Sequence, residues 1–142
     1  MSSQEFPPEF QPLPCPYVVF RAAGNKRSIN AETGKLSSAA FIRVPEKDED
    51  GISVYLGEVD TCIKASQQLK KTYAVGSLHV GHIRSIPTEG PRLDIVQDAN
   101  DHGLILGVPF QQEDALLAER LAGALADHAR TCWELKRTQQ DA

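Results

Sequence analysis

Alternating apolar and polar positions are densest between Tyr73 and Pro109, and this stretch predicts the centre of a sheet. From Ala74 onwards small or apolar residues occupy every second position, which is typical of a half-buried strand. Residues 92–98 predict a second strand, and residues 102–108, apolar on both faces, predict a central one. Turn-forming polar residues separate these two segments. We therefore expect a meander of three strands here.

Three further strands are predicted earlier in the chain, over residues 17–21, 39–44 and 52–56. The first is rich in β-branched and aromatic residues, and the third places Ile52, Val54 and Leu56 on one face. The connection between the second and third is acidic and ends in the turn-forming pair Asp50-Gly51. The total expected is about six strands.

Two segments have the apolar spacing of helices, residues 60–72 and residues 113 to about 137. Asp60 is a suitable N-cap for the first. In the second, Leu117, Leu121 and Leu125 recur on one side, and charged residues occupy the other. The order β-β-β-α-β-β-β-α predicts an α+β fold, with a mostly antiparallel sheet and the long C-terminal helix packed on it.

The composition fits one folded domain preceded by an arm. The chain has 142 residues, of which 41% are apolar and 24% charged, as in an ordinary soluble domain. Residues 1–16 contain five of the nine prolines and predict a disordered arm, because proline lacks an amide donor. Residues 17–137 are expected to form a single globular domain, and residues 138–142 a frayed tail.

Charge and cysteine content narrow the functional classes. A net charge of −4 gives no electrostatic case for binding nucleic acid. No apolar run approaches the roughly 20 residues of a membrane span, and the N-terminal residues lack the pattern of a secretory leader. Cys15, Cys62 and Cys132 are far apart and lack CxxC spacing, so neither a disulfide framework nor a metal site is expected. We expect a reduced, cytoplasmic protein.

The proline-rich arm suggests a role in protein association. Its prolines would hold it extended, and Phe6, Phe10 and Leu13 could then anchor it in the groove of a partner. The simpler interpretation is a tail without function. Because no complete catalytic set of residues is visible, our first hypothesis is a non-catalytic accessory domain. Its partner would be a larger bacterial protein, encoded by a neighbouring gene.

Two histidines lie in the run SLHVGHIRS, residues 77–85. This run resembles the ATP-binding HIGH signature of class I aminoacyl-tRNA synthetases, which implies that a strand ends and a helix begins here. The prolines and glycine that follow, over residues 87–91, argue against such a helix. We expect a strand that carries His79 on one face and His82 on the other, so that they bind no metal together.

A third histidine, His102, opens the predicted central strand beside Asp101 and Gly103. An aspartate next to a histidine could orient the imidazole so that it acts as a general base. Alternatively, Asp101 is a turn residue and His102 is the first residue of a strand, and neither has a catalytic role.

Wider resemblances give a second hypothesis. The segments 17–21, 37–41, 51–56 and 101–103 look like those of a family of small uncharacterised bacterial proteins. More remotely, Arg21 at the end of the first strand and Tyr55 in the sequence VYL resemble positions in RES-type ADP-ribosyltransferase-like domains. Such domains use an arginine, a glutamate and a serine around NAD.

This remoter resemblance implies an NAD-using enzyme built around Arg21 and Tyr55, and our second hypothesis adds His102 to them. The arginine would hold the phosphates of NAD, because a guanidinium matches phosphate oxygens. The glutamate expected in the helix after VYL is missing, and Glu58 is the nearest substitute. Whether the chain is an enzyme therefore stays open between the two hypotheses.

Overall fold

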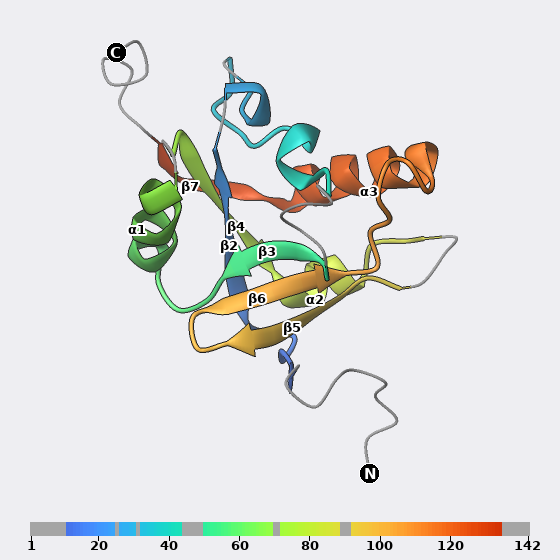
Figure 1. The fold of residues 1–142 in the computed structure, drawn as a ribbon, viewed down its shortest axis with the longest axis horizontal. Helices are drawn as coiled ribbons and strands as arrows, with labels where there is room; N and C mark the ends of the chain where they lie inside the picture. Colours follow the sequence, from blue (N-terminus) through green and yellow to red (C-terminus); the bar gives the residue numbers. More distant parts are fainter. Residues whose placement is uncertain are drawn as a thin grey trace.

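The computed structural model describes residues 11–24, 26–30, 32–43, 50–69, 72–88 and 92–134. These residues form a single sheet of seven strands in the order β1-β5-β6-β3-β2-β4-β7 (Figure 1). Every neighbouring pair is antiparallel. The strands are β1 (Gln11–Pro12), β2 (Val18–Ala23), β3 (Ile52–Tyr55), β4 (Ala74–His79), β5 (Asp94–Ala99), β6 (His102–Leu106) and β7 (Arg130–Glu134). The helices are α1 (Val59–Leu69), α2 (Val80–Arg84) and α3 (Ala115–His128), with short 3-10 helices η1 (Lys26–Ser28) and η2 (Ser38–Phe41).

The sheet has two halves that meet at a narrow seam. β2 pairs with β4 along its whole length, from Val18 opposite His79 to Ala23 opposite Ala74. Between β2 and β3, in contrast, only Phe20 and Tyr55 are paired. In Figure 1, β2 and β4 run steeply across the view, whereas β3, β6 and β5 run nearly at right angles to them. The strong right-handed twist of strands is therefore concentrated at this seam.

One face of the sheet carries the main core. Successive residues in a strand point to opposite faces, so Val19 and Val54 lie on the face away from Phe20 and Tyr55. Val19 and Val54 are buried in one cluster with Leu121 and Leu125 of α3. The N-terminus of α3 is capped by Asp114, whose Oδ1 accepts the amide of Leu117 at 3.1 Å. The predictions of an α+β fold and of a helix packed on the sheet are confirmed.

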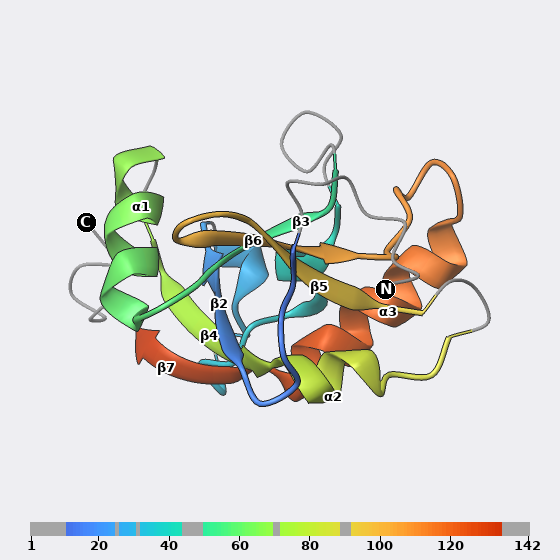
Figure 2. The same ribbon diagram turned by 90° about the horizontal axis from the view of Figure 1, so that it is seen from below.

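Helix α1 lies at the other end of the molecule from α3 (Figures 1 and 2). It contacts β2, β3 and β4, and its Cys62 is fully buried. Asp60, predicted as its N-cap, lies instead in its first turn, where a carboxylate still complements the helix dipole. None of the helices in the described ranges is long and apolar enough to cross a membrane.

The strand predicted over residues 39–44 is wrong. The chain forms the 3-10 helix η2 there, and its Ala40 and Phe41 are buried in the core beside α3. Both sides of β2 are already paired, with β3 and with β4, so the segment has no vacant place next to that strand. Its apolar residues enter the core from a turn instead.

The long predicted helix ends early. α3 stops at His128, and residues 130–134, which include Arg130 from the expected charged face of the helix, form the edge strand β7 against β4. Thr131, Cys132 and Trp133 are residues with low helix and higher strand preference, and the leucine repeat ends at Leu125. The predicted residues 135–137 and the tail 138–142 lie outside the described residues.

The N-terminal boundary also needs correction. Residues 11–16 were expected to belong to a disordered arm, but Gln11 and Pro12 pair with β5. The Leu13 amide donates to the carbonyl of Ile95 at 3.0 Å, and the Leu13 side chain is only 5% exposed. Leu13 is therefore a core residue of its own domain and is not available as an anchor for a partner. Phe6 and Phe10 lie outside the described residues.

Candidate functional site

Tyr55 and His102 form the centre of the candidate site. Tyr55 ends β3, His102 begins β6, and the two residues are directly opposite each other in the strand register. Their rings pack edge to face, with centroids 5.3 Å apart and planes at 84°. The amide of Leu56 donates to the carbonyl of Asp101 at 3.0 Å, which holds the end of β3 against the β5–β6 hairpin. Both side chains are half-buried and lie on the face opposite the main core.

The carboxylate in contact with His102 belongs to Asp98, whereas the sequence suggested Asp101. Asp98 Oδ1 lies 2.7 Å from His102 Nδ1. The ladder between β5 and β6 shifts register between Gln97 and Ala99, so Asp98 is the extra residue of a bulge. A bulge re-aims the side chain it carries, and here the carboxylate reaches along the hairpin to the imidazole. Asp101 is exposed at the turn.

Arg21 lies on the neighbouring strand β2, directly after Phe20, so its side chain leaves the sheet on the face that carries Val19 and not on the face of Tyr55. Its Nε donates to the carbonyl of Ala40 at 2.8 Å, and its Nη1 donates to the carbonyl of Ser53 at 2.7 Å. These bonds tie β2, β3 and η2 together at the seam of the sheet. Arg21 was expected to hold the phosphates of NAD, but two of its donor groups, Nε and Nη1, are bound to backbone oxygens instead.

The charges of the site act on Tyr55. Burial raises the pKa of the Tyr55 phenol and the neighbouring Cys62 raises it further, while the positive charge of Arg21 opposes both. The phenol therefore stays protonated at neutral pH and can act as a hydrogen-bond donor. Tyr55 and His102 lie side by side, whereas the guanidinium of Arg21 is bound to the carbonyls of Ala40 and Ser53.

Cys62 is close to this group but is not a nucleophile. Burial raises the pKa of its thiol to about 12, although Arg21 works in the opposite direction. Only the thiolate is strongly nucleophilic, so Cys62 is inert near neutral pH. Glu58, the suggested substitute for the missing glutamate, is exposed in the turn before α1.

The other histidines gather at a second place. β4 ends at His79 and α2 begins at Val80, so the chain turns between the two histidines and the prediction of opposite faces is wrong. The rings of His79 and His82 are 4.5 Å apart, and His128 at the end of α3 is 5.8 Å from His82. A β-carbon on Gly81 would lie 3.3 Å from the His79 ring, so glycine permits this close approach.

This histidine cluster lacks the arrangement of a metal site. Within the described ranges, no three His, Cys, Asp or Glu side chains are placed to hold a metal ion. His79 Nδ1 is buried and, within the same ranges, has no hydrogen-bond partner.

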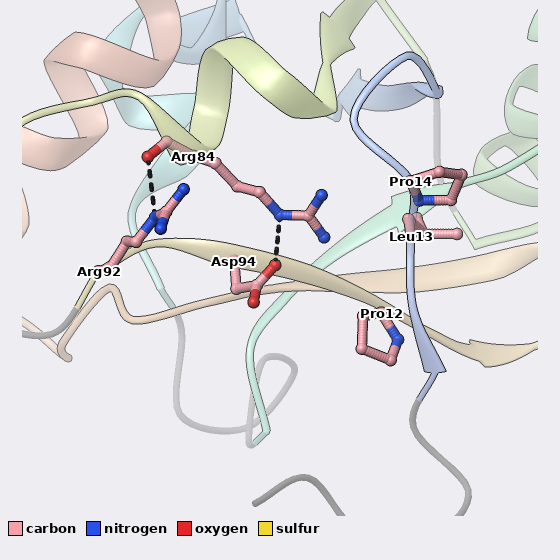
Figure 3. A pocket seen from close by; sticks show the side chains of 6 residues that line it. All are labelled: Pro12, Leu13, Pro14, Arg84, Arg92 and Asp94. Atoms are coloured by element: carbon pink, nitrogen blue, oxygen red, sulfur yellow. Dashed lines mark hydrogen bonds and ion pairs between the residues drawn. The ribbon is translucent and has the colours of Figure 1, made fainter. Parts of the chain in front are cut away.

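A pocket of about 480 Å³ opens on a different side of the molecule, between the N-terminal segment and the α2–β5 region (Figure 3). Its base is the ion pair of Arg84 and Asp94, 2.7 Å apart. Arg92 lines one wall and donates to the Arg84 carbonyl at 3.3 Å. The opposite wall is made by Pro12, Leu13 and Pro14.

The two opposite charges at the base of this pocket are paired with each other. Burial alone would lower the pKa of Arg84, but its hydrogen bonds to Asp94 and Cys15 outweigh that effect and raise it. Arg84 is thus a permanent cation that Asp94 already neutralises. Sequence reasoning missed this pocket, because it assigned the proline segment that forms one wall to a disordered arm.

Comparisons of this chain with protein-family models, with curated proteins and with solved structures found no match.

Proposed function

We propose that this chain is an NAD-using enzyme of the ADP-ribosyltransferase-like group, with its site at Tyr55 and His102. One observation carries the proposal. Arg21 and Tyr55, the two residues of the resemblance, and His102, the histidine selected separately, come from β2, β3 and β6, which are successive neighbours in the sheet. Nothing in their spacing along the chain required this.

The chemistry of the group suits part of an NAD molecule. The Tyr55 ring offers an aromatic face and a phenol that stays protonated, which suits a planar base and a ribose hydroxyl. His102 can accept or donate a proton, and so takes the place of the glutamate that the resemblance predicts in the helix after VYL. Arg21 serves mainly as a brace between the strands, since Nε and Nη1 are bound to Ala40 and Ser53.

The test is a thermal shift with NAD at millimolar concentration. A ligand that binds the folded state raises the melting temperature, so wild-type protein should melt higher with NAD than without it. Tyr55→Ala and His102→Ala should remove the shift. His128→Ala, which changes an exposed histidine far along the chain, should keep it. No shift for the wild-type protein would overturn the proposal.

Arg21→Ala is a poor probe of NAD binding. It removes two hydrogen bonds to backbone carbonyls and should destabilise the protein whether NAD binds or not. The melting temperature of that variant must therefore be compared with its own value in the absence of NAD.

The accessory role is a second candidate, and the open edge of the sheet favours it. β7 ends the strand order, and of the described strands only β4 pairs with it. An unpaired edge can accept a strand from a partner. A pull-down with a variant that lacks residues 1–10 tests whether Phe6 and Phe10 contribute. Partners captured equally well by the shortened chain would exclude these two anchors.

A further inference from the structure

The contact between Asp98 and His102 determines which nitrogen of the imidazole can accept a proton. A carboxylate accepts hydrogen bonds and does not donate them when ionised. At 2.7 Å from Asp98 Oδ1, the Nδ1 atom of a neutral His102 must therefore carry the proton. The other nitrogen, Nε2, is then left with its lone pair.

The surroundings hold the ring in this orientation. The bulge at Asp98 fixes the carboxylate, and the edge-to-face packing on Tyr55 limits rotation of the imidazole. The side chains of His102 and Asp98 are 28% and 22% exposed, so the pair is sheltered yet still accessible. A base is effective when its orientation is set before the substrate arrives.

We propose that Asp98 is the positioning residue that makes His102 Nε2 a proton acceptor, and that the acceptor substrate is an oxygen nucleophile, either water or an alcohol. This inference rests on the proposed NAD-using function. In the reaction, the bond between the ribose carbon and the nicotinamide nitrogen breaks, and its electron pair leaves with nicotinamide. A bond forms between that carbon and the acceptor oxygen, and the acceptor proton passes to Nε2 of His102.

The nature of the base argues for oxygen and against the guanidinium of an arginine. A hydroxyl already has a lone pair and needs to lose its proton only as the new bond forms. A guanidinium has no such lone pair until it is deprotonated, and its pKa is so far above that of an imidazole that His102 could not remove the proton beforehand. The Asp98–His102 pair therefore selects the substrate class as well as assisting the transfer.

Two aspartates in one hairpin supply the experiment, Asp98→Asn and its matched control Asp101→Asn. Asp101 is next to His102 in sequence but its side chain is exposed at the turn. Nitrogen-15 NMR of the imidazoles measures the tautomer directly. Wild-type protein and Asp101→Asn should show His102 protonated on Nδ1, and Asp98→Asn should lose this preference. Protonation on Nε2 in the wild-type protein would overturn the positioning role.

Nicotinamide release from NAD is the second measurement. Asp98→Asn should slow it by roughly 100-fold or more, the usual contribution of an oriented general base. Asp101→Asn should stay within about threefold of wild type. Equal rates for the two variants would overturn the positioning role even if the tautomers differ. Asparagine is close in shape to aspartate, so both variants should fold normally. Their melting temperatures check this.

Products distinguish the acceptors. ADP-ribose alone identifies water, and a glycerol adduct formed in added glycerol identifies an alcohol. An adduct with agmatine, an arginine analogue, would contradict the oxygen assignment. If wild-type protein releases no nicotinamide, the proposed function and the acceptor class both fail. The NMR measurement needs no NAD, so it still decides whether Asp98 orients His102.

Discussion

Phe20 and Tyr55 are the only residues through which β2 and β3 are paired. The two halves of the sheet are thus joined by little backbone hydrogen bonding at the position where the candidate site lies. Arg21 compensates, since it follows Phe20 and its guanidinium binds the carbonyl of Ser53, two residues before Tyr55. The site therefore depends on a side chain for part of its rigidity.

Replacement of Arg21 by alanine should reduce the free energy of unfolding by about 1.5–3 kcal/mol, the usual contribution of hydrogen bonds from charged groups. Denaturant melts measure this directly. Arg27→Ala removes an exposed arginine from η1 and should change stability by under about 0.5 kcal/mol. A small effect for both variants would mean that Arg21 does not brace the seam.

Two leucines of α3 provide a matched pair for testing its packing. Leu121 is buried in the core, whereas Leu116 is 77% exposed. Leu121→Ala should cost about 2–5 kcal/mol, because it removes buried apolar surface and leaves a cavity. Leu116→Ala should cost no more than about 0.5 kcal/mol. Equal costs would show that α3 is not packed on the sheet.

Deletion of residues 1–16 should lower stability. The arm hypothesis predicted no such effect, but the deletion removes the buried Leu13 side chain and the β1–β5 pairing. Leu13→Ala should destabilise the chain by about 2 kcal/mol or more, whereas Pro14→Ala, at an exposed neighbour, should have a much smaller effect. If the melting temperature of the deletion variant equals that of the wild-type protein, Leu13 does not contribute to the core as described.

Cys15 and Cys62 should differ in reactivity. At pH 8, iodoacetamide should label the exposed Cys15 readily and leave the buried Cys62 untouched until the protein unfolds. Peptide mass spectrometry distinguishes the sites. Labelling of Cys62 as fast as Cys15 in the native protein would contradict its burial.

The same thiol predicts a dependence of stability on pH. Its pKa rises from the ordinary value of 9.0 in the unfolded chain to about 12 in the folded one. The protonated thiol is thus favoured in the folded state, and this stabilisation is complete below pH 9.0 and is lost as the pH rises towards 12. Over that range the free energy of unfolding should fall more steeply for wild-type protein than for Cys62→Ala. Parallel curves would exclude this contribution.

The sequence predicted those parts of the fold whose patterns extend over several residues. The alternation in β3 and β4 and the leucine spacing of α3 are repeated often enough to determine one structure. Residues 39–44 are apolar without a strict alternation, and there the choice depended on whether β2 had a vacant neighbour. That information is tertiary and is absent from the local sequence.

The candidate site was predictable in its residues but not in its contacts. Arg21 and Tyr55 were identified from a resemblance and His102 from its place beside Asp101, but the carboxylate that contacts His102 is that of Asp98. The bulge that selects Asp98 is an insertion of one residue in the ladder, and its position has no clear signature in the chain. The turn from β4 into α2 was also missed. Pro87 was taken to exclude a helix here, but α2 is so short that it ends before Pro87.

The pairing of β1 with β5 also determines the order in which this protein can fold. Gln11 is opposite Gln97, so 86 residues of chain must be made and arranged before the first strand finds its partner. Contacts between such distant residues form slowly, because the closing of a long loop costs entropy before any contact stabilises it. On the ribosome, the segment that emerges early must therefore wait with Leu13 uncovered until the β5–β6 hairpin is complete. We expect the docking of this segment to be a late folding event, and the hairpin edge to remain open to incorrect pairing until it occurs.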